Sequence, residues 1–341
     1  MPEPLAKCAR TSSSFRLGSM CTGIGMCHRA ALALSARNLS LDFTFVFASE
    51  VARAARKVLS TDFPHLQLFG DACECVEDLP PCDIFVAGFP CQPFSYANRK
   101  RKGSADTRCD VIGAILRYIE RVCPRVVIFE NVPGILAWGR CVLALLMDSL
   151  QKLGYVMDLE CLKSHVHGGV PQKRKRLYVV ALRAPSGPLV WPGAVPMRPL
   201  PSLLCDEVGE VGAVPRAPLA AMKVKKVQRQ LAQFNLSSHE LLHMVVNCHG
   251  QLGQLSVEAT PCLTSARGGQ GGFWLLGKHR MMTVAELCRL QGLDPDTTCL
   301  GVVVSNRQAG MLLGNSFTLP VIGRVLAACL RSIGCSVEDP F

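Results

Sequence analysis

The stretch that organises this chain reads Gly88-Phe89-Pro90-Cys91-Gln92-Pro93-Phe94-Ser95. Residues 83–88 form an apolar run that predicts a buried strand of a parallel sheet. Cys91 therefore falls just past the strand's carboxyl end, where open α/β sheets bind their ligands. Because Pro90 and Pro93 fix their own φ angles and keep the preceding residues out of helical conformation, we expect a stiff, extended segment that presents one thiol.

Positive charge follows this thiol closely, since residues 99–102 read Arg-Lys-Arg-Lys. Cations beside a cysteine favour its thiolate, so we expect Cys91 to ionise more readily than a free cysteine. The alternative is that Cys91 is simply one small apolar side chain among 18 cysteines.

Composition narrows the class of protein. A chain of 341 residues with 49% hydrophobic residues predicts a packed globule of one large domain or two smaller ones. We find no apolar run of the ~18 residues needed to span a bilayer and no secretory signal, so we expect an intracellular protein without a membrane partner. The expected location is the nucleus if the protein is eukaryotic and the cytoplasm if it is bacterial. Eighteen cysteines then imply free thiols, and the net charge of +11 fits a polyanionic partner.

The N-terminal third predicts a nucleotide-type cradle. Residues 15–21 read as a strand, Thr22-Gly23-Ile24-Gly25 as a turn and residues 26–36 as a helix. A plain tight turn is the alternative. Glu50 and Asp71 end the next two predicted strands, residues 43–50 and 66–71, where acids can bond the ribose and amine of an adenosine. Glu50 could instead cap the helix after it. The alternation of elements predicts a Rossmann-like, doubly wound, mostly parallel sheet.

We expect one more acid, Glu130, to lie close to Cys91. Glu130 lies in the hydrophobic strand predicted over residues 126–134, so we expect it to be partly desolvated with a raised pKa. Because Cys91 and Glu130 should end neighbouring strands, we prefer a functional interpretation to that of a surface carboxylate.

A basic segment runs into a later strand. Period-two alternation places Gln172, Arg174 and Arg176 on one face, and arginine suits fixed contact with carboxylate or phosphate. A solvated charge run is the alternative. From Ala184 prolines end the α/β pattern, which predicts a smaller, irregular domain over residues 184–275, between parts 1–183 and 276–341 of a catalytic domain. Within it we expect a basic helix at 222–234 facing phosphates and a flexible basic loop at 267–272.

Two helices follow in the last part of the chain. Thr283 and Glu286 predict a capping box at the start of one helix, and residues 319–332 predict another that folds back on the first strand.

A competing motif is His239-Glu240-Leu241-Leu242-His243, which matches the His-Glu-x-x-His pattern of zinc peptidases. His249 has the offset of a third ligand, but Val246 stands where that pattern needs glycine. This interpretation leaves Cys91 and Glu130 without a role, so we expect no metal.

The octapeptide resembles the nucleophile loop of the C5-cytosine DNA methyltransferase family, and the family's ordered blocks can be followed from Leu17 to about Ile333. The resemblance implies that Cys91 is the nucleophile and Glu130 the acid, and that Arg174 and Arg176 hold the flipped base and its phosphates. It implies an S-adenosylmethionine pocket made by Cys21, Gly23, Ile24, Gly25, Glu50, Val51, Asp71, Ala72, Pro90, Asn315 and Ser316. It implies nucleic-acid contacts by Gln92, Ser95, Lys100, Arg101, Gln172, Arg267 and Gly268.

The same resemblance makes residues 184–275 a target-recognition domain and double-stranded DNA the partner of a monomeric enzyme. Three departures thin the adenine side of the cofactor pocket: Cys21 stands where the family usually has an aromatic residue, Met26 where it usually has glycine, and Val51 where it commonly has an aromatic or large apolar residue. In the recognition domain, Cys262-Leu263 replaces a usual Thr-Leu, a change that does not touch the chemistry. The alternatives are the branch that methylates cytosine in tRNA and a catalytically silent DNA-binding relative. Phe94-Ser95 resembles the DNA branch.

Overall fold

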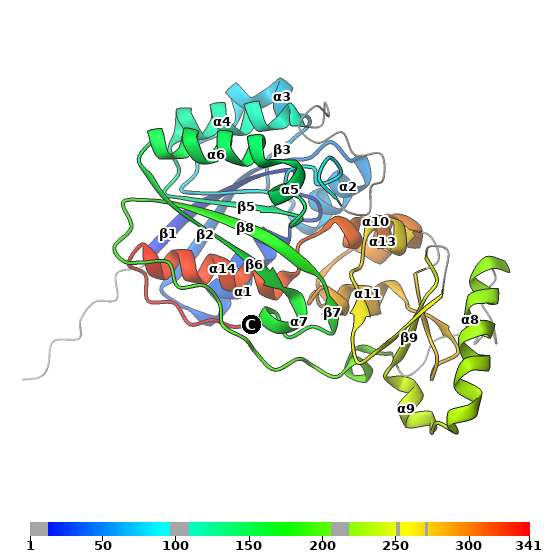
Figure 1. The fold of residues 1–341 in the computed structure, drawn as a ribbon. Coiled ribbons are helices and arrows are strands. Elements are labelled where there is room, and N and C mark those ends of the chain that lie inside the picture. Colours follow the sequence, from blue (N-terminus) through cyan, green and yellow to red (C-terminus); the bar gives the residue numbers. More distant parts are fainter. Residues whose placement is uncertain (1–12, 96–108, 206–217, 250–252, 270–271) are drawn as a thin grey trace, which may run out of the picture.

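The structure is a computed structural model and describes residues 13–95, 109–205, 218–249, 253–269 and 272–341. Its central sheet has seven strands in the order β3-β2-β1-β4-β5-β8-β6 (Figure 1). Their bounds are β1 Ser13–Met20, β2 Leu41–Ser49, β3 Leu68–Phe69, β4 Ile84–Ala87, β5 Val126–Asn131, β6 Tyr155–Lys163 and β8 Lys175–Arg183. Strand β8 runs antiparallel to both neighbours, and the other pairings are parallel. The predicted Rossmann-like, mostly parallel sheet is confirmed.

Helices cover both faces of this sheet because its strands are apolar on both sides. On β4, Ile84 and Val86 join one hydrophobic cluster while Phe85 and Ala87 join the other. Helices α1 (Met26–Arg37) and α14 (Leu319–Ser332) lie on the first face, and α4 (Val111–Val122) and α6 (Arg140–Lys152) on the second (Figure 1). The helix predicted at residues 319–332 therefore packs on the sheet as expected.

Further elements connect these layers. They are α2 Arg53–Asp62, α3 Ala72–Cys75, α5 Ile135–Trp138, α7 Ser164–His167, α11 Val284–Leu290, α12 Leu300–Val303 and α13 Asn306–Asn315, with the 3₁₀ helices η1 Val76–Asp78, η4 Leu200–Leu203, η5 Ala232–Phe234 and η6 Pro295–Thr297. Helix α11 begins with the predicted capping box, in which the Thr283 hydroxyl accepts from the Glu286 amide and the Glu286 carboxylate from the Thr283 amide.

One stretch corrects the expectation that no run is long and apolar enough for a bilayer. Residues Asn306–Ser332, which comprise α13 and α14, meet that test by length and composition. However, 89% of the most apolar window is buried within the fold, which is typical of the core helices of a globular protein.

A smaller unit lies beside the large sheet and is regular, contrary to the predicted irregular structure. Strands β10 (Gln254–Val257), β9 (Met244–Asn247), β12 (Phe273–Leu275) and β13 (Arg280–Met281) form an antiparallel sheet. Helix α8 (Pro218–Leu231) covers it through a hydrophobic cluster that includes Val224 and Trp274 (Figure 1). The prediction of α8 as a basic helix holds only in part, because Lys223 is buried and donates to the Cys248 carbonyl oxygen at 2.8 Å.

Three short elements join the two units. Strand β7 (Gln172–Lys173) pairs in parallel with β11 (Thr260–Pro261), so two segments far apart in sequence lie side by side. Residues Ser265–Gly269 form helix α10, which corrects the prediction of a flexible loop over this part. A Cβ on Gly268 would lie 1.8 Å from the Gly310 carbonyl oxygen, so α10 and α13 touch backbone to backbone. This backbone contact with α13 holds α10 in place.

Candidate active site

A cavity of about 650 Å³ lies at the carboxyl ends of β1 to β5, as the fold class predicts. Its lining comprises Cys21, Gly23, Ser49, Glu50, Val51, Ala52, Ala55, Asp71, Ala72, Cys73, Gly88, Phe89, Pro90, Cys91, Gln92, Asp110, Val111, Glu130, Arg174, Arg176, Leu312, Gly314 and Asn315. The four residues predicted as catalytic and eight of those predicted for the cofactor therefore share one space.

The Cys91 loop is held from two sides. The Asn131 side chain, at the end of β5, donates to the Phe89 carbonyl oxygen at 3.2 Å. The Phe94 amide donates to the Cys91 carbonyl oxygen at 3.0 Å, so the chain turns directly after Cys91 and is not extended as predicted. Phe94 is fully buried and anchors that turn. The turn that carries Cys91 is therefore held against the end of β5.

The acidity predicted for Cys91 is wrong for this state of the protein. Burial raises the pKa of its thiol, and Arg176 and Arg174 only partly oppose that rise. Lys100 and Arg101, from which we expected the positive charge, lie outside the described residues. The described cations that act on Cys91 instead come from β8 and the residue before it.

Glu130 extends from β5 beside Cys91 and meets Arg176. The Arg176 Nε lies 3.0 Å from Glu130 Oε1, and both side chains are largely enclosed by protein. Burial raises the pKa of Glu130, as we expected, while the two arginines work against that rise. Because Ala87 pairs with Phe129 across β4 and β5, Cys91 follows one strand and Glu130 lies near the carboxyl end of its neighbour.

Arg174 ties three segments together beneath the cavity. Its guanidinium donates to the backbone oxygens of Leu263 at 2.8 Å, Gly314 at 3.1 Å and Ser316 at 2.6 Å. Ser316 is buried and is not among the residues that line the cavity, so its predicted contact with the cofactor stays a prediction. Burial lowers the pKa of Arg174.

Gln172 does not face solvent either. Its amide is fully buried, where it donates to the Leu290 carbonyl oxygen at 3.0 Å and accepts from the Leu263 amide at 2.8 Å. The predicted nucleic-acid contact by this side chain is therefore wrong. Its groups satisfy backbone atoms that would otherwise be buried without partners.

Hydrogen bonds join the glycine turn at Gly23 to the carboxylate of Glu50. One Glu50 oxygen accepts from the Gly23 amide at 2.8 Å and the other from the Ala52 amide at 2.9 Å, at the start of α2. Glu50 therefore lines the cavity and accepts from the residue that precedes α2, without capping the helix amides themselves. Its predicted contact with a ribose stays a prediction. Gly23 has a φ of +61° and a Cβ there would meet nothing within 4 Å, so its backbone borders open space.

Ile24 and Gly25 belong to this turn and face the protein core. Ile24 is fully buried in the core, and a Cβ on Gly25 would lie 2.8 Å from the Phe63 ring. Neither is among the residues that line the cavity, so their predicted cofactor contacts stay predictions. Asp71, by contrast, lines it and uses one oxygen to cap α3 through the Cys73 amide at 2.9 Å.

The other residues predicted to contact nucleic acid differ in their surroundings. Gln92 is exposed and lines the cavity, whereas Ser95 is half-buried outside it. Arg267 donates to the Cys262 carbonyl oxygen at 2.5 Å, and Gly268 packs on Gly310. Both therefore have structural partners within the protein.

Sequence reasoning missed some of the lining. Cys73, Asp110 and Leu312 contribute side chains to the cavity and were not predicted as site residues. Cys73 and Asp110 had a usable signal, because each lies next to a strand-end acid or a strand-end loop. Leu312 had none, since it reaches the cavity from α13 near the other end of the chain.

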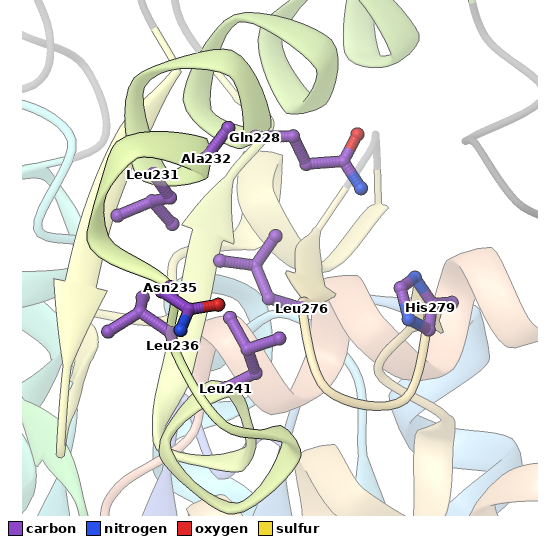
Figure 2. A pocket seen from close by; sticks show the side chains of 8 residues that line it. All are labelled: Gln228, Leu231, Ala232, Asn235, Leu236, Leu241, Leu276 and His279. Atoms are coloured by element: carbon purple, nitrogen blue, oxygen red, sulfur yellow. The ribbon is translucent and has the colours of Figure 1, made fainter.

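A second cavity, of about 290 Å³, lies in the smaller unit (Figure 2). Leu231 of α8, Leu241 of α9 (Ser238–Leu242) and Leu276, which follows β12, line it together with Gln228, Ala232, Asn235, Leu236 and His279. The zinc-peptidase alternative finds no support nearby: Glu240 is engaged in a capping box, and His243 bonds Glu258 at 3.0 Å. The described residues contain no group of three or more His, Cys, Asp or Glu side chains able to hold a metal ion.

The fold and the cavity together define an α/β methyltransferase, with acids after β2 and β3 and a cysteine–glutamate pair at the ends of β4 and β5. The chain belongs to the C-5 cytosine-specific DNA methylase family, whose model matches residues 15–210. It is a DNA cytosine methyltransferase.

Individual relatives agree with this assignment. The type II methyltransferase M.NgoBI of Neisseria gonorrhoeae is 30% identical over 84% of this chain and 86% of its own length. M.NgoBV of the same species is 34% identical over 44% of this chain, a match that spans 37% of that relative. Among solved structures, the S. pombe Dnmt2 methyltransferase superposes with a TM-score of 0.68 over 94% of this chain and all of its own, at 18% identity, and so supports the fold.

Proposed function

We propose that the protein transfers a methyl group from S-adenosylmethionine to C5 of a cytosine rotated out of double-stranded DNA, through a covalent bond to Cys91. The observation that carries the proposal is that Cys91 and Glu130 line one cavity with the adenosine-type acids Glu50 and Asp71. That cavity therefore offers a nucleophile, an acid and a cofactor cradle together.

The residues fit S-adenosylmethionine, which supplies an electrophilic methyl group when bound. Gly23 leaves the cavity open where its backbone turns, and Glu50 keeps lone pairs for ribose hydroxyls beyond its two amide contacts. Asp71 and the exposed Val51 lie on the same wall. Asn315 reaches the cavity from α13.

The protein's own part in the chemistry is to activate cytosine, because C5 alone is a poor nucleophile. The Cys91 thiolate adds to C6, and Glu130 donates a proton or hydrogen bond to N3, so that electron density moves to C5. The raised pKa of Glu130 suits a group that donates a proton near neutral pH. After methyl transfer, a water molecule takes the C5 proton, the electrons of the C5–H bond re-form the C5–C6 double bond, and Cys91 leaves C6 as a thiolate.

The arginines have different parts in this proposal. Arg176 lines the cavity and holds the Glu130 carboxylate, so it is placed to contact the base or its phosphate. Arg174 acts mainly as a tie between backbone segments. We propose that its guanidinium keeps the Arg176 side of the cavity in place.

Residues 184–275 are proposed as the target-recognition part, with 276–341 returning to the catalytic part and the enzyme acting as a monomer inside the cell. Lys225, Lys226 and Arg229 are exposed on α8 and available to phosphates. Rotating a base out of the helix costs roughly a few kcal/mol, which contacts of this kind must offset. Binding is therefore expected to weaken as salt increases.

The decisive experiment is a covalent trap. Duplex DNA with 5-fluorocytosine at target positions is incubated with protein and S-adenosylmethionine, and the adduct is resolved under denaturing conditions. The fluorine cannot leave as a proton, so the wild type should remain bound and Cys91→Ala should not. A parallel reaction with fluorinated tRNA tests the other substrate: trapping on tRNA alone reassigns the substrate, and no adduct on either overturns the proposal.

A further inference from the structure

A second cysteine contacts the catalytic arginines. The Cys262 sulfur lies 3.8 Å from Arg174 Nη1 and 3.9 Å from Arg176 Nη2, both within hydrogen-bonding range of sulfur. Its carbonyl oxygen accepts from Arg267 Nη1 at 2.5 Å. Three guanidinium groups from two distant parts of the chain therefore surround one residue.

Backbone pairing holds this sulfur in place. Cys262 directly follows β11, whose Thr260 and Pro261 pair with Gln172 and Lys173 of β7. The next residue, Leu263, donates its amide to Gln172 Oε1 at 2.8 Å. Cys262 is thus fixed beside Arg174 by contacts on both of its sides, and its position does not depend on its own side chain.

The charge around Cys262 favours an anion. Arg174, Arg176 and Arg267 bring three positive charges, whereas Glu130 is the carboxylate that pairs with Arg176. The arginines lower the pKa of the Cys262 thiol in spite of its burial, which on its own would raise it. The shift at Cys91 runs the other way, so the two thiols of this site differ in character.

Arg176 uses a separate edge of its guanidinium for each partner. Its Nε faces Glu130 at 3.0 Å, its Nη1 donates to the Lys175 carbonyl oxygen at 2.8 Å, and its Nη2 points to the Cys262 sulfur. These contacts restrict the rotation of the planar guanidinium about its stem, although Glu130 Oε1 receives charge attraction and no well-aligned hydrogen bond from Nε. Without the sulfur of Cys262, the Arg176 guanidinium would be less constrained where it faces Glu130.

We propose that Cys262 is a positioning residue of the methyl-transfer site, whose sulfur accepts from the Arg176 guanidinium and holds it against Glu130. The arginines around this sulfur favour its thiolate form. This role rests on the proposed function, because it needs Glu130 to act on cytosine. Cys262 itself touches neither substrate nor cofactor in this role. A hydroxyl side chain at this position fills similar space but does not ionise near neutral pH, so only a thiol or carboxylate can supply the charge.

The first test needs no turnover. Ligand-free wild-type protein is pulsed with iodoacetamide at a series of pH values from about 6 to about 10, and alkylation of each cysteine is read by peptide mass spectrometry. Cys161 serves as the internal reference, since burial raises the pKa of its thiol. Cys262 is expected to reach half-maximal alkylation at a lower pH than Cys161. An equal or higher pH overturns the thiolate.

The second test measures single-turnover methyl transfer against pH for Cys262→Ser and Cys262→Asp, with Cys161→Ser as the matched control. Cys262→Ser is expected to slow transfer about tenfold, the loss of one charge-assisted hydrogen bond, with an unchanged KM for S-adenosylmethionine. Cys262→Asp should restore most of the rate and keep it at pH values where the wild-type rate falls. A merely structural role predicts no such rescue.

The outcomes separate the two proposals. If wild type methylates DNA and Cys262→Ser keeps its rate and pH profile, the positioning role is wrong while the proposed function stands. If wild type forms no adduct with cytosine in any nucleic acid, the proposed function fails and the positioning role fails with it. The alkylation result is obtained from wild type alone, so a variant that misfolds does not remove the test.

Discussion

Arg176 and Glu130 form an ion pair with a 3.0 Å separation, and their side chains are only 14% and 10% exposed. An enclosed carboxylate tends to take up a proton, because burial disfavours its charged form. An arginine beside it favours the charged form. Burial has the larger effect, so the pKa of Glu130 is raised, which suits a group that donates a proton to a bound base.

Glu130→Gln is expected to slow methyl transfer by about 10²- to 10⁴-fold, the usual contribution of a general acid. The amide keeps the shape of the carboxyl group, so affinities for DNA and S-adenosylmethionine should change little. Single-turnover kinetics with labelled methyl donor measure the effect. Glu160→Gln, on the exposed side of β6, is the matched control. A rate for Glu130→Gln equal to that of the control would exclude the proposed role of Glu130.

The reactivity of Cys91 should rise with pH. Burial raises the pKa of its thiol, so the thiolate is the minor form at neutral pH and its fraction grows about tenfold per pH unit until the pKa is reached. Alkylation of Cys91 in the ligand-free enzyme should therefore level off at a higher pH than that of N-acetylcysteine. Arg176→Gln should move the plateau higher still, because Arg176 lowers this pKa. A plateau below that of N-acetylcysteine would contradict the buried-thiol account.

Local signals explain which predictions from the sequence were correct. The apolar run before Cys91 and the capping box at Thr283 depend on residues close together in the chain, and the structure confirms both. Strand β6 was missed because its pattern is that of an edge strand. Its side chains alternate between half-buried and exposed along most of its length, so it lacks the apolar run that marked β4.

Predictions that depended on distant segments were less successful. Period-two spacing correctly placed Gln172 and Arg174 on one side of the segment but could not show that β11, almost ninety residues later, pairs with β7. The acidity of Cys91 was judged from charges that follow it in sequence, whereas burial, a property of the whole fold, sets the direction of its pKa shift. The glycines of α10 were taken as signs of flexibility, although Gly268 is a close-packing position.

Glu50→Gln is expected to weaken S-adenosylmethionine binding about tenfold or more, measured by isothermal titration calorimetry. The carboxylate accepts from the Gly23 and Ala52 amides, and an amide side chain would turn an N–H group toward one of these donors. Burial raises the pKa of Glu50, so wild-type affinity should also fall as pH decreases, whereas that of Glu50→Gln should not. Glu74→Gln, exposed on α3, is the control. Equal affinities for the two variants would remove Glu50 from the cofactor cradle.

Gly310→Ala tests the contact between α10 and α13. A Cβ there would lie 2.1 Å from the Gly268 carbonyl oxygen, and backbone cannot move aside as a flexible side chain can. We expect the free energy of unfolding to fall by about 1–3 kcal/mol, as for other overpacked positions, measured by denaturant titration. Gly301→Ala is the matched control, since Gly301 is exposed in α12 and its Cβ would meet nothing within 4 Å. That variant should stay within about 0.5 kcal/mol of wild type.

Because Gly314 on the same helix accepts from Arg174, Gly310→Ala should also slow methyl transfer. If both variants unfold with the wild-type midpoint, α10 and α13 are not in the close contact described.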